Sequence, residues 1–319
     1  MDGNSLPRTI SENDTGLADA VAILRAGGLV AVPTETVYGL AARADSDAAV
    51  AGIYRAKGRP DFNPLIVHVT GLEQAEQLAI IDTRARALAD AFWPGALTMV
   101  LPVRPGAPLA AAVTAGLPTV ALRCPAHPVM RRLLEGSGLA LAAPSANRSG
   151  AVSPTSADHV AASLGNRVGM IVDGGPCAAG LESTIVALRA GGGWQILRPG
   201  PITAAQIAEV LGSTGEALVP ASGIEAPGQM TSHYAPGKPV RLDADKAREG
   251  EYLIGFGGIA GDFNLSATAD LTEAAARLYV ALHGAADSPC PAIAVAPIPE
   301  RGIGIAINDR LRRAAAPVG

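Results

Sequence analysis

Residues 46–70, SDAAVAGIYRAKGRPDFNPLIVHVT, contain the change from helix to strand that decides the fold. The first half has apolar residues at helical spacing, and Ser46 is a favourable N-cap for such a helix. Gly58 and Pro60 then interrupt the helical pattern. The segment LIVHVT (65–70) is rich in β-branched residues and is typical of a short buried strand. The stretch therefore predicts a helix followed by a strand, which is the repeating unit of α/β proteins.

The same alternation continues on both sides of this stretch. GLADAVAILRAGG (16–28) predicts a helix that stops at glycine, and LVAVP (29–33) predicts the strand after it. Helices are also expected over 83–93, 127–135, 155–165 and 203–211, between strands at ALTMVLPV, TVALRC, LALAAPS, GMIVDGG, STIVALR and WQILRPG. The last two segments, joined by AGGG, predict an antiparallel pair with a tight turn. The sheet is therefore expected to be mixed.

A change of composition divides the chain. Residues 212–238 are rich in Gly, Pro, Ser and Thr and have no hydrophobic period, which is typical of a linker. PVRLDA, EYLIGFG, LTEAAARLYVALHG, AIAVAPIP and IAINDRLRRAAA follow and predict a second, smaller α/β unit. We therefore expect one domain over 1–211, a linker over 212–238 and a second domain over 239–319.

Composition favours a globular protein with a small-molecule ligand. Of 319 residues, 49% are hydrophobic, 3% are aromatic, and the net charge is -4, which argues against a broad nucleic-acid surface. The first 16 residues lack the pattern of a signal peptide, and no apolar run approaches the ~18 residues of a membrane span. Three distant cysteines suit reduced cytosolic thiols, and five histidines without ligand spacing make a structural zinc site unexpected.

Polar residues gather where the predicted strands begin or end. They are Thr34, Glu35 and Thr36 after LVAVP, Ser145 and Asn147 after LALAAP, Ser183 and Thr184 in STIV, and Arg198 at the end of WQILR. In open α/β sheets, ligands bind in the crevice outside the strand ends, so these side chains are expected to converge. Lys57 is notable because the chain has only two other lysines, Lys238 and Lys246, among 25 lysines and arginines.

Each of these residues also has a purely structural interpretation. Lys57 and Arg59 suit a solvated helix C-terminus, Ser145 and Asn147 suit a turn, and Ser153 and Thr155 suit a helix N-cap. His68 could be a core histidine, Glu182 could belong to a strand-edge pair, and GFGGIAG (255–261) runs into no helix and suits a plain turn. The sequence contains neither a P-loop nor a GxSxG motif.

Seven ordered blocks together resemble the YrdC-like family. They are PTETVYGLAA (33–42), KGRPDFNPLIVHV (57–69), WPGALTMVL (93–101), TVALRCPAHP (119–128), APSANRSGAVSPT (143–155), ESTIV (182–186) and LRPGPIT (197–203). SHYAPGKPV (232–240) and GIGIAINDRLRRA (302–314) resemble the linker and tail of its long form, the threonylcarbamoyl-AMP synthases. This resemblance implies a twisted mixed sheet with flanking helices and a smaller C-terminal Rossmann-like α/β domain.

The resemblance also implies a cytoplasmic enzyme of the nucleotidyltransferase type. It would join L-threonine, bicarbonate and ATP, with Mg2+ carried by ATP, to give threonylcarbamoyl-AMP and pyrophosphate. The product would pass to the tRNA threonylcarbamoyl transferase machinery that modifies certain tRNAs. Direct tRNA binding is expected to be weak or absent, and no membrane association is expected.

The motifs of the family assign site residues by position. The threonine pocket would be lined by Thr36, His68, Arg123, Ala143 and Ser183. ATP would contact Lys57, Arg59, Asn63, Thr119, Ser145, Asn147, Ser153, Arg198 and Tyr234, with Lys57 and Arg59 as catalytic cations and no metal ligand from protein side chains. The linker would act as a lid. Ser232 departs from the basic residue common in the family, and Lys238 is a possible replacement for that cation.

Two other functions fit parts of the pattern. One is an RNA-binding module without ATP chemistry, in which Arg131 and Arg132 lie on a basic rim. The other is a carbamoyl transferase of the hydrogenase-maturation type, although the zinc-finger cysteines and acylphosphatase segment of those proteins are absent from this sequence.

Overall fold

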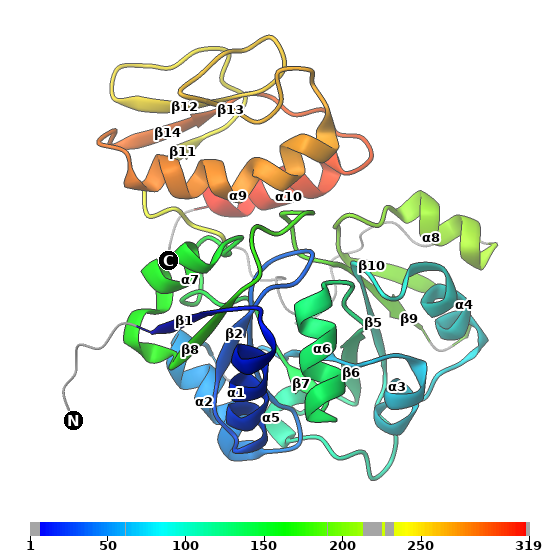
Figure 1. Cartoon of the computed structure of the whole chain (residues 1–319). Coiled ribbons are helices and arrows are strands. Elements are labelled where there is room, and N and C mark those ends of the chain that lie inside the picture. The colour runs from blue at the N-terminus through cyan, green and yellow to red at the C-terminus, as the bar shows by residue number, and fades with distance from the viewer. Residues whose placement is uncertain (1–6, 61, 190, 213–224, 227–232, 317–319) are drawn as a thin grey trace.

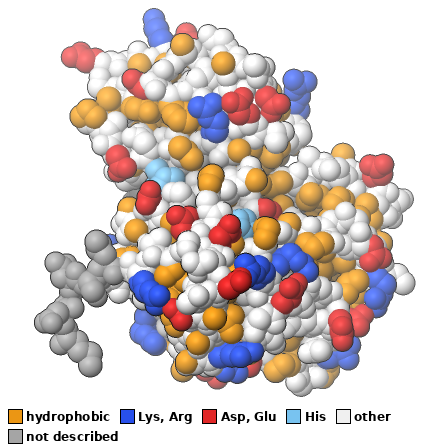
Figure 2. All heavy atoms as spheres, in the orientation of Figure 1, with side chains coloured by type: hydrophobic (Ala, Val, Ile, Leu, Met, Phe, Trp, Pro, Cys, Tyr) orange, Lys and Arg blue, Asp and Glu red, His pale blue; other side chains and the backbone are white. Residues whose placement is uncertain are grey.

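Two α/β lobes make up the protein in the computed structural model, which describes residues 7–60, 62–189, 191–212, 225–226 and 233–316. In Figure 1, helices α9 and α10 of the smaller lobe face the larger lobe, and the small sheet lies on their far side. Figure 2 shows the same two lobes joined at a narrower waist. Most of the linker expected over 212–238 lies outside the described residues, so its proposed function as a lid stays a prediction.

The larger lobe is built on one sheet of ten strands within the described residues. These strands are β1 (Arg8–Ser11), β2 (Val30–Val32), β3 (Gly39–Arg43), β4 (Ile66–His68), β5 (Leu97–Pro102), β6 (Thr119–Arg123), β7 (Leu141–Ala142), β8 (Met170–Asp173), β9 (Thr184–Leu188) and β10 (Trp194–Arg198). Their order in the sheet is β1-β8-β2-β3-β7-β4-β6-β5-β9-β10. The sheet contains parallel pairs such as β4 with β6 and antiparallel pairs such as β5 with β6, so the expected mixed sheet is confirmed.

Helices flank this sheet in Figure 1. They are α1 (Asp14–Arg25), α2 (Asp47–Lys57), α3 (Leu72–Leu78), α4 (Thr83–Phe92), α5 (Ala111–Thr114), α6 (Pro128–Ser137), α7 (Ala157–Leu164) and α8 (Ala204–Leu211), with a short 3-10 turn η1 (Gly165–Arg167). A core of Ala, Val, Leu and Ile lies between helices and sheet, as the low aromatic content requires.

Local capping explains where the helix before the key loop begins and ends. The Ser46 side chain accepts a hydrogen bond from the backbone N–H of Ala49 at the start of α2. Gly58 ends the helix with φ 61°, a left-handed conformation that glycine adopts without a Cβ clash. At α7 the cap is Ser156, so the alternative that Ser153 or Thr155 caps this helix is wrong.

The smaller lobe contains a four-stranded parallel sheet and two helices among its described residues. The strands are β11 (Val240–Arg241), β12 (Glu251–Gly255), β13 (Phe263–Asn264) and β14 (Ala292–Val295), and the helices are α9 (Leu271–Asp287) and α10 (Gly304–Ala315). The sheet order is β11-β14-β12-β13 with parallel pairing throughout, which confirms the expected Rossmann-like α/β class. GFGGIAG forms a turn after β12, as its lack of a following helix predicts. Among the described helices, none has the length and apolar character needed to cross a membrane.

Candidate active site

A partly enclosed polar pocket lies where strand ends of the large sheet meet the smaller lobe. It is lined by Thr34, Thr36, Val37, Gly39, Arg59, Ile66, His68, Arg123, Ala143, Pro144, Ser145, Glu182, Arg198, His233 and Tyr234. These residues come from strands β2, β3, β4, β6, β7 and β10 or the residues next to their ends, from the loop after α2, from the loop before β9, and from the segment that leads into the smaller lobe. Of the polar strand-end residues singled out in the sequence, Thr34, Thr36, Ser145 and Arg198 line this cavity, whereas Glu35, Asn147, Ser183 and Thr184 do not.

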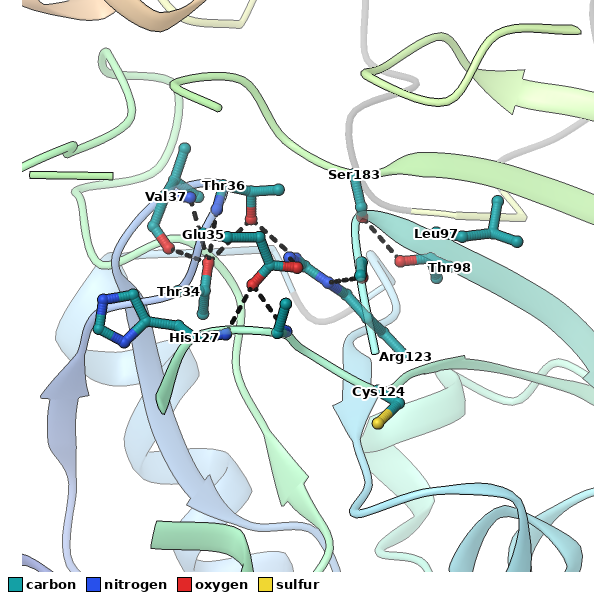
Figure 3. A network of polar contacts seen from close by, with 12 residues as sticks. Thr34, Glu35, Thr36, Val37, Leu97, Thr98, Arg123, Cys124, His127 and Ser183 are labelled. Carbon is teal, nitrogen blue, oxygen red and sulfur yellow. Dashed lines mark hydrogen bonds and ion pairs between the residues drawn. The ribbon is translucent and has the colours of Figure 1, made fainter. Parts of the chain in front are cut away.

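Arg123 is held rigidly at one end of the pocket. In Figure 3 its guanidinium lies between Glu35 and Thr36. Nη2 is 2.7 Å from Glu35 Oε1, Nη1 donates to Thr36 Oγ1 at 2.8 Å, and Nε donates to the Gly95 carbonyl at 3.2 Å. A guanidinium has five N–H donors, so among the described residues two remain for a ligand. A planar, fixed fork of this kind suits a carboxylate.

Glu35 lies behind Arg123 and fixes its orientation. Its Oε2 accepts hydrogen bonds from the backbone N–H groups of Ala126 and His127 at 3.0 and 3.4 Å. Burial is the largest single influence and opposes ionisation of Glu35, but the charge and hydrogen bond of Arg123 together with backbone hydrogen bonds outweigh it, so the pKa of Glu35 lies below its ordinary value. The carboxylate is therefore ionised at neutral pH and keeps Arg123 in place.

His68 and Ala143 line the pocket beside Arg123. Burial, followed by the charge of Arg123, lowers the pKa of His68 to about 3, so the imidazole is neutral. Its buried Nδ1 meets no hydrogen-bond partner among the described residues. An atom in this situation is suited to a polar group of a bound ligand.

Ser183 lies behind the pocket wall. Its hydroxyl is 2.7 Å from Thr98 Oγ1 and accepts from Arg198 Nη2 at 3.1 Å. Arg198 also donates from Nε and Nη2 to the Ser183 carbonyl, at 3.1 and 2.9 Å. Its Nη1 has no partner in the part of the chain that the structure describes, so this nitrogen is available to an anionic ligand.

The other cation lining the pocket is Arg59, in the loop after α2. It donates to the carbonyls of Asn63 and Pro64, which holds the loop closed on itself. Burial lowers the pKa of Arg59 to about 10, and it stays charged at neutral pH. Ser145 lines the same wall, and Asn63 is buried in the loop that Arg59 closes.

Tyr234 enters the pocket from outside the large sheet. It is fully buried, and its φ of 64° is a left-handed conformation that non-glycine residues rarely adopt. Its hydroxyl meets no hydrogen-bond partner among the described residues. The next residue is tied to the large lobe by a hydrogen bond from the Ala235 N–H to the Gly150 carbonyl, at 2.8 Å. This strained segment is therefore fixed against the pocket.

Lys57 is not on a solvated helix end, so that interpretation is wrong. Its side chain is 2% exposed, and Nζ donates to the carbonyls of Ser145 and Asn147 at 2.6 Å each. Burial, followed by the charge of Arg59, lowers the pKa of Lys57 well below its ordinary value. Lys57 therefore supports the 145–147 loop from behind, and it is absent from the described pocket lining.

Four further predicted ATP contacts, Asn63, Asn147, Ser153 and Thr119, also lie outside the pocket lining. Asn147 donates to the carbonyls of Arg148 and Ala151, which agrees with its interpretation as a turn former. Ser153 donates to Glu182 at 2.6 Å. Thr119 begins β6, at the opposite end of that strand from Arg123, and pairs with Pro102.

Lys238 does not replace the missing basic residue of the linker. Its Nζ donates to the carbonyls of Ala285 and Ser288 at the end of α9, at 2.9 and 2.6 Å. The ammonium therefore caps a helix C-terminus, where unpaired carbonyls attract cations. The earlier expectation that it compensates for Ser232 is wrong.

Glu182, Tyr279 and Arg310 form a buried cluster that sequence reasoning did not find. Arg310 Nε and the Tyr279 hydroxyl each lie 2.8 Å from Glu182 Oε2, so the interpretation of Glu182 as a strand-edge residue is wrong. Arg310 could have been noticed because it falls at helical spacing with Ile307, Leu311 and Ala314 on the buried face of α10. A charge on an apolar face needs a buried partner.

Fold and pocket together define a class of protein: a two-lobed α/β protein whose pocket lies at the strand ends and is lined by the buried arginines Arg123 and Arg198. Residues 22–200 match the family model Sua5_yciO_yrdC, described as Telomere recombination, and residues 202–316 match the threonylcarbamoyl-AMP synthase C-terminal domain. The chain therefore belongs to the Sua5, YciO and YrdC family, in its long form with the additional C-terminal domain.

Individual relatives agree with this assignment. The threonylcarbamoyl-AMP synthase of Bacillus subtilis is 42% identical over 329 residues, which cover 96% of this chain and 94% of the relative. The synthase of Pyrococcus abyssi is 40% identical over 93% of both chains. The crystal structure of P. abyssi Sua5 complexed with L-threonine has a TM-score of 0.88, with 36% identity and 98% coverage of both chains.

Proposed function

We propose that this chain synthesises L-threonylcarbamoyladenylate from L-threonine, bicarbonate and ATP, with release of pyrophosphate, for threonylcarbamoyladenosine modification of tRNA. It is a nucleotidyltransferase in this scheme and acts in the cytoplasm, where ATP and tRNA are both available. A separate tRNA threonylcarbamoyl transferase would consume the adenylate. The full-length likeness to relatives named threonylcarbamoyl-AMP synthase supports this function.

The observation that carries the proposal is the fixed fork of Arg123 beside the neutral imidazole of His68. The fork would bind the threonine carboxylate through its two remaining N–H donors. Thr36, His68, Ala143 and the Ser183 segment would surround the rest of the amino acid. The threonine complex of the P. abyssi protein supports a threonine site in this family.

The nucleotide would occupy the other end of the pocket. Arg59 and Arg198 would contact the triphosphate, and Ser145 and Tyr234 would contact the same substrate. Lys57, Asn63 and Asn147 would act through the loops that they hold, and Thr119 and Ser153 would mark the outer edges of the nucleotide site. Of the two residues proposed as catalytic, Arg59 would contact the triphosphate directly. Lys57 would act indirectly, by holding the 145–147 loop in position.

The reaction needs little acid–base help from the protein. The threonine amine would attack bicarbonate to give a carbamate and water, and a carbamate oxygen would then attack the α-phosphorus while pyrophosphate leaves. Because a carbamate is already an oxygen nucleophile, positioning supplies much of the rate, about 7–11 kcal/mol in favourable cases. Arg198 and Arg59 would stabilise charge on the phosphates.

Magnesium fits this scheme as a companion of ATP. Among the described residues, no group of His, Cys, Asp and Glu side chains is arranged to hold a metal ion. Glu182 faces the pocket, but both of its oxygens already accept hydrogen bonds from Ser153, Tyr279 and Arg310. Mg2+ bound to the triphosphate would neutralise part of the nucleotide charge.

The deciding experiment measures pyrophosphate release from ATP by the purified full chain with Mg2+. Release is expected only when L-threonine and bicarbonate are both present, with formation of an adenylate of matching mass. Release without either, or ATP binding with no release under any condition, would reject the synthase. A steeply salt-dependent binding of tRNA without turnover would instead favour the RNA-binding module.

A further inference from the structure

Two side chains of the smaller lobe bind the carboxylate of one pocket-lining residue, Glu182. Glu182 lines the pocket and is buried. Its Oε1 accepts from Ser153 Oγ at 2.6 Å, within the larger lobe. Its Oε2 accepts from two groups of the smaller lobe, the Tyr279 hydroxyl on α9 and Arg310 Nε on α10. Helices α9 and α10 therefore neutralise a charge that belongs to the pocket.

Arg310 contacts three parts of the pocket wall without lining the pocket itself. Besides Glu182, its Nη2 donates to the Pro199 carbonyl at 2.9 Å, directly after Arg198. Its guanidinium lies 5.3 Å from the centre of the Tyr234 ring, within cation–π range. The side chain is fully buried. A buried charge with these contacts fixes the walls in relation to one another.

Removal of Arg310 would change the electrostatics of the nucleotide end. Glu182 would keep its negative charge but lose the cation that compensates it. Arg198 is the next nearby cation that stabilises this carboxylate. The carboxylate would therefore compete with phosphate for Arg198 and repel the triphosphate.

We propose that Arg310 is a positioning residue for ATP: it neutralises Glu182 and steadies Tyr234, so that Arg198 remains available to the triphosphate. The smaller lobe would then contribute to nucleotide binding through the positive charge of Arg310, which compensates the negative charge of Glu182. This inference rests on the proposed function in placing ATP at the Arg198 end of the pocket and, for the comparison in its test, L-threonine at the Arg123 end.

The test is Arg310→Met, which keeps much of the buried volume and removes the charge. Calorimetry with Mg-ATP and the full chain is expected to show a rise in Kd of about tenfold or more, because one partner of a buried ion pair has been removed. The Kd for L-threonine, which binds at the Arg123 end, should change less than about threefold. Arg312→Met on the exposed face of α10 is the matched control, since Arg312 pairs only with Glu300 in the described structure, and it should bind ATP normally.

A double variant separates charge from structure. Asp309 also loses Arg310 as a partner in Arg310→Met but keeps its ion pair with Arg313, so Glu182 is the carboxylate left without a cation. Adding Glu182→Gln to Arg310→Met removes that charge, and it should recover most of the lost ATP affinity. Equal losses for ATP and threonine without recovery would overturn the proposal, as would unchanged ATP affinity in folded Arg310→Met. Should Arg310→Met fail to fold, Tyr279→Phe gives the same test: ATP affinity about threefold weaker supports the proposal, and wild-type affinity overturns it.

Nucleotide binding is measured without turnover, so the two proposals can fail separately. If wild-type protein releases no pyrophosphate but the variants show the expected order of ATP affinities, the synthase function fails and the positioning function of Arg310 stands. If pyrophosphate is released normally but the affinities do not follow that order, Arg310 has a structural function only.

Discussion

Two buried Arg–Glu pairs flank the same pocket, and they face it in opposite directions. In the pair of Arg123 and Glu35, the arginine lines the pocket and the carboxylate lies behind it. In the pair of Arg310 and Glu182, the carboxylate lines the pocket and the arginine lies behind it. The N–O distances, 2.7 and 2.8 Å, are almost equal, so the difference lies in orientation and not in bond length.

The comparison shows how one chemical pair can serve two functions. A buried pair contributes little net stability because its desolvation offsets its attraction. What it fixes is which charge a ligand meets: a cation at the proposed threonine end and a neutralised anion at the proposed nucleotide end. The first pair lies within the larger lobe, whereas the second depends on docking of the smaller lobe.

Arg123→Ala should give the largest effect because it removes the charge that faces the ligand. We expect the KM for threonine to rise about 100-fold, corresponding to about 3 kcal/mol for a charge-assisted contact, and the KM for ATP to change less than about threefold. Steady-state pyrophosphate release measures both. Arg86→Ala is the control, since Arg86 forms an exposed ion pair with Glu76 and neither residue is part of the pocket lining. A larger effect on the KM for ATP would contradict the assignment.

Lys57→Met tests a buried lysine whose Nζ donates hydrogen bonds to backbone carbonyls and has no carboxylate partner among the described residues. Turnover should fall about tenfold or more, because the carbonyls of Ser145 and Asn147 lose their donor and the loop shifts. The melting temperature should also fall, an effect that the sequence alone does not indicate. Lys246→Met, at an exposed position, should change neither quantity. Normal turnover would show that the 145–147 loop does not depend on Lys57.

Much of the fold could be predicted because its strands and helices differ in local pattern. The helix of residues 46–58 and strand LIVHVT occur as expected, and STIVALR and WQILRPG pair in antiparallel fashion. The sequence does not indicate strand β3 (GLAAR) because it lacks the β-branched residues typical of strands, and tertiary contacts with its sheet neighbours and with the core beside α2 stabilise it. Strand β1 (RTIS) is a short, mostly exposed edge strand with an equally weak pattern.

Site residues could be predicted from the sequence only where the residue and the neighbours that position it belong to strand ends that the motifs identify. The pocket wall formed by Arg123, Thr36 and His68 follows from strand ends. The partners of Glu182 could not be found in this way, because Tyr279 and Arg310 lie 97 and 128 residues away. Lys238 illustrates the same limit: its charge suggests phosphate, but its position relative to α9 makes it a helix cap.

Glu35→Gln tests the comparison more finely. It replaces the ion pair between Glu35 and Arg123 by a neutral hydrogen bond and leaves Arg123 itself in the pocket. The amide can still accept one hydrogen bond, but it no longer fixes Arg123 by charge. The KM for threonine should rise about tenfold, less than for Arg123→Ala, with kcat nearly unchanged. Glu135→Gln, in an exposed i,i+4 pair with Arg131, should have no effect. An unchanged KM in Glu35→Gln would mean that Thr36 and Gly95 suffice to hold Arg123.

The smallest effect concerns the lobe interface that carries the second pair. His159 of α7 stacks on His283 of α9 with ring centres 3.8 Å apart, and Figure 2 shows histidine atoms near the waist between the lobes. Burial, followed by the neighbouring His283, lowers the pKa of His159 to about 4, although Asp158 and Asp287 act in the opposite direction. Burial also lowers the pKa of His283.

The sign of the pH effect follows from these shifts. The unfolded chain takes up the proton near pH 6.5 and the folded chain only near pH 4, so the contribution to stability is full above 6.5 and falls as the pH approaches 4. Because His159 is partly solvated, we expect a loss of only about 1 kcal/mol across this window. Urea unfolding from pH 7 to pH 4 should therefore show a flatter pH dependence for His159→Gln than for wild type. Parallel curves would mean that the stacked pair does not sense protonation, and that the docking of the smaller lobe depends on the buried Glu182 cluster instead.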